Sequence, residues 1–141
     1  MQIGILWPTF VLVALIYAIW LFLFIKRIGH MKANPPRAAD FETGEAALRY
    51  FTPVEMPANN LRNLFEMPVL YFALVPLLLI TRHGNHIEVA LAWIFVFLRV
   101  IHSVIHATSG PVKARFLVYL LSCAVLSAMW IGFAVDLALG R

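Results

Sequence analysis

The sequence predicts an all-α integral membrane protein, a bundle of four transmembrane helices. Of its 141 residues, 62% are hydrophobic and only 13% are charged, and the mean hydropathy is +0.86, far from the composition of a soluble domain. Residues 1–25 and 116–135 contain no Asp, Glu, Lys or Arg. Each of these runs is long enough to cross a bilayer core, which takes about 20 apolar residues.

The first apolar segment, at about residues 3–26, is expected to be a transmembrane helix and not a cleaved signal peptide. Its apolar stretch is too long for a signal peptide, and no basic residue precedes it. Lys26 and Arg27 follow it where a signal peptide would have a small-residue cleavage site.

The connection that follows, at about residues 27–57, is the only long one. Pro35-Pro36 breaks any helix there. The stretch "ETGEAALRYF" is expected to form a short helix on the membrane surface.

Three further apolar segments lie at about residues 58–81, 86–107 and 114–138. Spanning segments must be helices, because an unpaired backbone group in hydrocarbon costs several kcal/mol. The links "RHGNH" and "TSGPVK" are short, so consecutive helices are expected to be antiparallel neighbours. Residues 1–141 therefore form a single predicted domain.

The distribution of Lys and Arg predicts the orientation in the membrane. The side of the bundle that holds the first and third connections is strongly basic, with Lys26, Arg27, Lys32, Arg37, Arg49, Lys113 and Arg115. The opposite side has only Arg82 and Arg141. Both termini are expected on the non-cytoplasmic side. The short connections and the lack of a retention signal favour a bacterial inner membrane.

Charge and cysteine content exclude several classes of function. The net charge of +4 comes from basic residues beside apolar segments, which are typical topology signals and do not predict nucleic-acid binding. Cys123 is the single cysteine, so one chain can form neither a disulfide nor a cysteine metal site. It is interpreted as a packing residue.

Three helical segments carry polar stripes near the same, cytoplasmic, end. In the second segment the stripe has the spacing i, i+3, i+4 and i+7 of one helix face, and comprises Asn59, Arg62, Asn63 and Glu66. In the third and fourth segments the stripes comprise Arg99, His102 and His106, and Arg115, Tyr119 and Ser122.

These stripes have three possible interpretations. In the first, arginines neutralise Glu66 and asparagines bridge helices, which fixes the packing and does nothing more. In the second, Arg62, Arg99 and Arg115 outnumber Glu66 and form a basic pocket for an anionic ligand. In the third, His102, His106 and Glu66 bind a metal, but the flanking arginines would repel a cation, so no metal site is predicted.

The segment Arg62-Asn63-Leu64-Phe65-Glu66, the stretch "RVIHSVIH" from Arg99 to His106, and Arg115 nine residues later together resemble the MAPEG family, membrane-associated proteins in eicosanoid and glutathione metabolism. The similarity extends over nearly the whole chain. It implies a homotrimer of four-helix protomers, in contact with membrane lipids, with glutathione bound between adjacent protomers at the cytoplasmic side.

The resemblance also implies roles for individual residues. Glutathione, as cosubstrate, would be held by arginines at its two carboxylates and by Glu66 at its amine. The residues expected to bind it are Asn59, Arg62, Asn63, Glu66, Arg99 and His102. The thiolate would be stabilised by Arg115, with Tyr119 or His106 assisting by hydrogen bonding.

The predicted function is that of a glutathione-dependent transferase or peroxidase acting on a lipophilic electrophile or lipid hydroperoxide that diffuses in from the bilayer. The thiolate comes from the cosubstrate, so no nucleophile of the protein is required. The alternative is a non-catalytic membrane scaffold or lipid-binding member of the same family.

Overall fold

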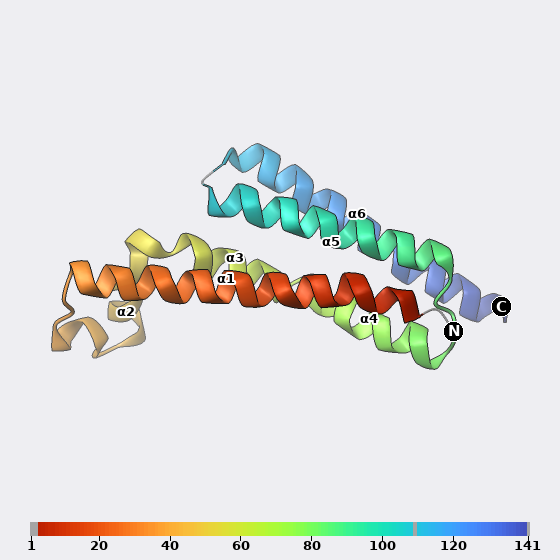
Figure 1. Ribbon diagram of the computed structural model, residues 1–141, viewed down its shortest axis with the longest axis horizontal. Helices are drawn as coiled ribbons and strands as arrows, with labels where there is room; N and C mark the ends of the chain where they lie inside the picture. Colours follow the sequence, from red (N-terminus) through yellow and green to blue (C-terminus); the bar gives the residue numbers. More distant parts are fainter. Residues whose placement is uncertain (1–2, 109, 141) are drawn as a thin grey trace.

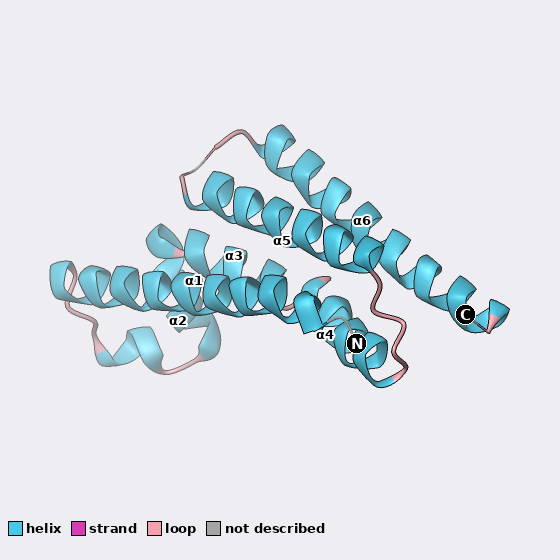
Figure 2. Ribbon diagram, turned by 45° about the vertical axis from the view of Figure 1, so that its right-hand side comes forward, coloured by secondary structure: helices cyan, strands magenta, loops and turns pink. Residues whose placement is uncertain are grey.

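Helices make up all the regular secondary structure of the residues that the computed structural model describes, 3–108 and 110–140 (Figures 1 and 2). Within these residues, four helical segments are long and apolar enough to cross a membrane: Ile3–Ala33, Met56–Ile80, His86–Ala107 and Val112–Leu139. The predicted all-α architecture with four membrane helices is confirmed. The two termini lie at the same end of the molecule, here named the terminal end (Figure 1); the opposite end, with residues 34–55 and the link after Ala107, is named the connection end.

The first span extends seven residues beyond its predicted end at residue 26. A short 3-10 helix, η1 (Ile3–Ile5), leads into α1 (Leu6–Ala33). Lys26 and Arg27 do not interrupt the helix, because both are good helix formers once outside the bilayer. The helix stops at Asn34, whose amide still donates to the carbonyl of His30 at 2.8 Å, because Pro35 and Pro36 follow.

The long connection folds into three short helices, η2 (Ala38–Phe41), α2 (Gly44–Phe51) and η3 (Thr52–Val54). The predicted short helix is α2, and it begins where the Thr43 hydroxyl accepts a hydrogen bond from the amide of Ala46 at 3.1 Å. An ion pair joins α1 to the end of the connection, with Arg27 Nη2 3.8 Å from Glu55 Oε2. In Figure 1 this region is the left end of the molecule.

An aromatic cluster fastens α2 to the end of α1. The ring of Tyr50 lies 4.9 Å from the rings of both His30 and Phe51, edge to face. The Tyr50 hydroxyl donates a hydrogen bond to the carbonyl of Asn34. Burial, together with the negative charge of Asp40, raises the pKa of Tyr50 above its ordinary value. The phenol therefore stays protonated and keeps its role as donor.

The second span consists of two helices, α3 (Met56–Leu64) and α4 (Pro68–Ile80), and not the single continuous helix predicted over residues 58–81. Pro68 explains the break: it has no amide hydrogen for the Leu64 carbonyl, and its ring would collide with that carbonyl in a continuous helix. The amide of Phe65 bonds instead to the carbonyl of Arg62 at 2.9 Å, three residues back. Glu66 lies in the break and not on a helix face.

The third and fourth spans form an antiparallel hairpin of α5 (His86–Ala107) and α6 (Val112–Leu139), close to their predicted bounds. The two helices lie side by side along most of their length (Figures 1 and 2). Asn85 caps the start of α5 by accepting from the Glu88 amide at 2.9 Å. Gly110 turns the chain, and its amide donates to the carbonyl of Ile105 at 2.8 Å.

The core lies where α1, α4, α5 and α6 meet. Tyr71 of α4 stacks on Phe95 of α5 with ring centroids 5.1 Å apart, and both side chains are fully buried. The Tyr71 hydroxyl lies 3.0 Å from the hydroxyl of Thr9 on α1, so its polar tip is satisfied inside an apolar core. Near the connection end, α3 is joined to α5 by two hydrogen bonds between the buried residues Asn60 and Ser103.

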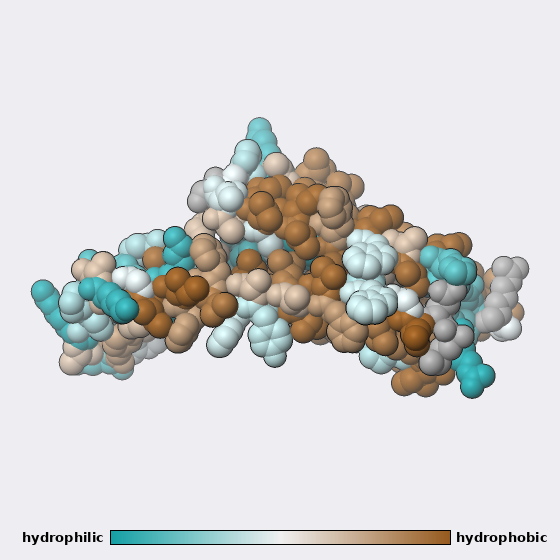
Figure 3. Space-filling view, in the orientation of Figure 1, coloured by the Kyte–Doolittle hydropathy of each residue, from teal (hydrophilic) through white to brown (hydrophobic). Residues whose placement is uncertain are grey.

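Apolar side chains also cover the outside of the molecule. Trp7 and Ile80 are among many large hydrophobic residues that are exposed, Ile80 at 79%. Figure 3 shows apolar residues over the middle of the molecule and hydrophilic ones mainly toward its two ends. An apolar surface of this extent fits contact with lipid or with further copies of the chain.

Candidate functional site

A polar cavity of about 220 Å³ lies near the connection end, between α3, α5 and α6. Its walls come from three of the four spans, so it exists only because the α5–α6 hairpin packs beside α3. The residues that line it are Asn63, His102, Val112, Arg115, Phe116 and Tyr119. Four of these, Asn63, His102, Arg115 and Tyr119, are residues that the sequence nominates for ligand binding or catalysis.

The turn at Gly110 brings the start of α6 against the end of α5. A side chain could not replace this glycine without strain, because an added Cβ would lie 2.9 Å from Ile105 Cγ2 and 3.1 Å from the Ile105 carbonyl oxygen. Five residues later, the carbonyl of Arg115 lies 3.3 Å from Nδ1 of His102. This contact fixes the His102 ring against the first turn of α6.

Arg99 is fully buried directly behind the cavity wall. Its guanidinium carbon lies 5.0 Å from the centroid of the Tyr119 ring, a cation–π distance. None of its three guanidinium nitrogens has a hydrogen-bond partner among the described residues. Burying a cation that has no hydrogen-bonded anion costs free energy, particularly at membrane depth. The positive charge of Arg99 therefore favours binding of an anion on this side of the cavity.

The two histidines of α5 occupy different places. His102 lines the cavity, and its ring lies 5.9 Å from the ring of Tyr119. His106 is buried one turn further along, with its ring 5.8 Å from that of His102, and does not line the cavity. Nε2 of His102 and Nδ1 of His106 are buried without a hydrogen-bond partner in the described chain.

Not all of the polar residues nominated in the second span lie at the cavity. Only Asn63 lines the cavity; Arg62 and Glu66 are exposed, and Asn59 is half-buried. Glu66 still interacts electrostatically with Arg99 and with Tyr119. The break at residues 65–67 explains why Glu66 leaves the face predicted for it.

Sequence reasoning missed Asn60, which is fully buried and makes the contact between helices that the neighbouring asparagines were expected to make. Its Nδ2 donates to the carbonyl of Ser103 at 3.3 Å, and the Ser103 hydroxyl donates to its Oδ1 at 3.2 Å. The sequence spacing contained a signal for this burial, because Asn60 shares one helix face with Pro57 and Leu64. All three are buried in α3. Asn60 is therefore part of the packing that holds Asn63 beside α5.

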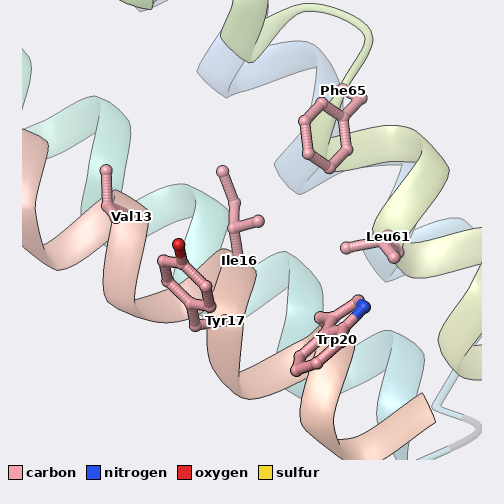
Figure 4. A pocket seen from close by; sticks show the side chains of 6 residues that line it. All are labelled: Val13, Ile16, Tyr17, Trp20, Leu61 and Phe65. Carbon is pink, nitrogen blue, oxygen red and sulfur yellow. The ribbon is translucent and has the colours of Figure 1, made fainter. Parts of the chain in front are cut away.

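A larger cavity, of about 310 Å³, lies between α1 and α3 and is lined by Val13, Ile16, Tyr17, Trp20, Leu61 and Phe65. Figure 4 shows the four α1 side chains on one side of the groove and Leu61 of α3 and Phe65 of the following break on the other, with Trp20 near Leu61. This apolar groove contains no ionisable acid or base apart from the Tyr17 phenol. Leu61 lies on the opposite side of α3 from Asn63, so α3 separates the groove from the polar cavity.

A metal ion at this site would need a third ligand beside His102 and His106. In residues 3–108 and 110–140 no group of three or more His, Cys, Asp or Glu side chains is placed to hold one. The neighbouring guanidinium groups of Arg99 and Arg115 would in addition repel a cation. The donor set of the cavity suits an anion with hydrogen-bonding groups.

Comparison with known proteins gives a single result. The sequence model of the MAPEG family matches residues 5–135, nearly the whole chain. No curated protein and no solved structure matches. The helical architecture, the four apolar spans and this match agree with one another. The protein is thus a multi-pass membrane protein that belongs to the MAPEG family, the membrane proteins of eicosanoid and glutathione metabolism.

Proposed function

We propose that the protein is a glutathione-dependent membrane transferase or peroxidase. It joins the thiolate of glutathione to a lipophilic electrophile, or uses it to reduce a lipid hydroperoxide, supplied from the bilayer. The observation that carries this proposal is the buried Arg99, which has no hydrogen-bond partner in the described structure and lies behind a cavity that also holds Arg115.

The chemistry of the cavity matches the tripeptide. Glutathione carries two carboxylates, one amine and one thiol, so its recognition calls for more than one cation and a single anion. Arg115 at the cavity and Arg99 behind it supply positive charge, and Glu66 interacts with that charge from the break in the second span. Asn63 adds an amide that can both donate and accept. These groups leave a net positive cavity, which favours an anionic cosubstrate.

Arg62 and Asn59 belong to this proposal as residues that act between copies of the chain. In one chain they lie outside the cavity, on a face of α3 that the chain itself leaves exposed or half-covered. We place a second protomer against this face, within a homotrimer, so that each glutathione is held by residues of two neighbours. The bundle lies in a bacterial inner membrane, with the terminal end on the non-cytoplasmic side.

Calorimetric titration of glutathione into the detergent-purified protein tests the proposal. Wild-type protein is expected to bind saturably, and Arg115→Ala to weaken binding by about 10- to 100-fold, the worth of one charge-assisted hydrogen bond. Arg49→Ala, on the exposed face of α2, is the matched control and is expected to bind like the wild type. Absence of binding at millimolar glutathione, from protein shown to be folded, would refute the proposal.

One observation favours the alternative of a non-catalytic lipid-binding protein. The apolar groove between α1 and α3 is larger than the polar cavity and is shielded from it by α3. Such a groove suits an acyl chain, which would bind there without meeting the thiol of the same protomer. A measurable rate of glutathione conjugation to an aryl halide by the purified protein would exclude this alternative.

A further inference from the structure

The tautomer of His102 is set by its contact with α6. Nδ1 of His102 lies 3.3 Å from the carbonyl oxygen of Arg115. A carbonyl can only accept a hydrogen bond, so Nδ1 must carry the hydrogen. In the neutral ring the hydrogen on Nδ1 leaves Nε2 with a free lone pair, ready to accept a proton.

That lone pair is unused in the protein. Nε2 is buried and has no hydrogen-bond partner among the described residues, while the His102 ring forms part of the cavity wall together with Asn63, Arg115 and Tyr119. A buried polar atom without a partner carries a desolvation cost that a ligand donor can relieve. A thiol is a donor of this kind.

The charges around His102 determine when the ring can be protonated. On its own helix Arg99 and His106 face it, and on α6 it faces Arg115 and the ring of Tyr119, while α3 contributes the neutral Asn63. Two guanidinium groups make an imidazolium costly as long as the cavity holds no anion. A thiolate formed between these groups offsets that cost, so proton transfer and formation of the thiolate are coupled.

We infer that His102 is the general base for the substrate thiol, a role that rests on the proposed function. The S–H bond breaks, the electron pair stays on sulfur, and the proton forms a new N–H bond at Nε2. The sulfur pair then attacks the electrophile; with an aryl halide a C–S bond forms, the halide leaves, and the imidazolium releases its proton to water. Arg115 and Arg99 stabilise the thiolate, and His102 removes the proton.

Counting protons distinguishes this base from activation by arginine alone. Glutathione is titrated calorimetrically into the detergent-purified wild-type protein in two buffers of different ionisation enthalpy, and the ultraviolet absorbance of the thiolate is recorded in parallel. If His102 takes the proton, the thiolate signal appears with no proton released to the buffer. If arginines alone lower the thiol pKa, the same signal comes with release of about one proton per thiolate.

His102→Asn sharpens the test, because the asparagine amide keeps a donor for the Arg115 carbonyl while removing the base. We expect this variant to bind glutathione, to lose the thiolate signal at neutral pH, and to conjugate about 10²- to 10⁴-fold more slowly, the usual contribution of a positioned general base. His86→Asn makes the same exchange on the same helix, about 24 Å away along its axis, and is expected to match the wild type.

The outcomes distinguish failure of the proposed function from failure of His102 as the base. Absence of glutathione binding by folded wild-type protein overturns the proposed function, and the base with it. Binding with proton release, or binding with no thiolate signal, overturns the base alone. Should His102→Asn fail to fold, the proton count of the wild-type protein still gives the answer.

Discussion

Arg99 is a residue whose position is costly for folding and useful for binding. Its side chain is fully buried, and within the described chain it has the Tyr119 ring as neighbour but no hydrogen-bond partner. The protein would be more stable with an apolar side chain of the same length, because a buried cation without an anion carries a large desolvation cost. The position of Arg99 fits a ligand that places negative charge beside it, in addition to the electrostatic interaction with Glu66.

We expect Arg99→Met to raise the free energy of unfolding in detergent, without glutathione, by about 1–4 kcal/mol, and to weaken glutathione binding. Chemical unfolding followed by circular dichroism measures the first effect, and calorimetry the second. Lys113→Met, at the exposed start of α6, is the control and should stay within about 0.5 kcal/mol of the wild type. A strongly destabilised Arg99→Met would show that Arg99 contributes mainly to packing.

The structure places some of the residues nominated from the sequence side by side and leaves others apart. His102, Arg115 and Tyr119 meet because α5 and α6 are regular helices, on which spacing determines the face. Asn60 was missed because the buried face of α3 depends on where α5 lies, which is not local information. Glu66 was misplaced because helical spacing was assumed to continue through the break before Pro68.

The bounds of the four spans could be predicted from the sequence to different degrees. Composition and length were enough to predict four spans, three of them within a few residues, because hydrocarbon permits little but helices. The division of the second span into α3 and α4 required attention to Pro68. The extension of α1 to Ala33 could not be predicted from hydropathy, because that part of the helix is polar; it lies against α2 and η3.

The turn at Gly110 is the element-scale feature most sensitive to change. We expect Gly110→Ala to destabilise the protein by about 1–3 kcal/mol, because its Cβ would press on the side chain and carbonyl of Ile105. The start of α6 would shift, and with it Arg115, so glutathione binding should weaken as well. Thermal unfolding and calorimetry in detergent measure the two effects.

Gly29→Ala provides the matched control for this substitution. Gly29 lies within α1, where an added Cβ would meet nothing within 4 Å. Alanine there should stabilise the helix by about 0.5–1 kcal/mol and leave glutathione binding unchanged. Equal behaviour of the two variants would contradict the role given to Gly110.

For the molecule as a whole, the proposed sharing of the site between neighbours predicts a trimer. Native mass spectrometry of the detergent-purified protein is expected to show a species with the mass of three 15.9 kDa chains. Arg62→Glu, on the exposed face of α3 that we assign to the contact between protomers, should shift this species toward monomer. A wild-type protein that is monomeric under gentle conditions would rule out a site shared between neighbours.

The break between α3 and α4 also affects the lipid around the protein. The helix α4 has 13 residues and is about 20 Å long, whereas the hydrocarbon layer is about 30 Å thick. The remaining depth is crossed by α3 and by the break, whose exposed Glu66 is costly to place among acyl chains. We expect the bilayer to thin there, or water to enter, because the break and α3 are more polar than α4. We expect this to leave a hydrated depression beside the cavity, a path by which the proposed water-soluble cosubstrate would reach the depth where lipophilic molecules dissolve.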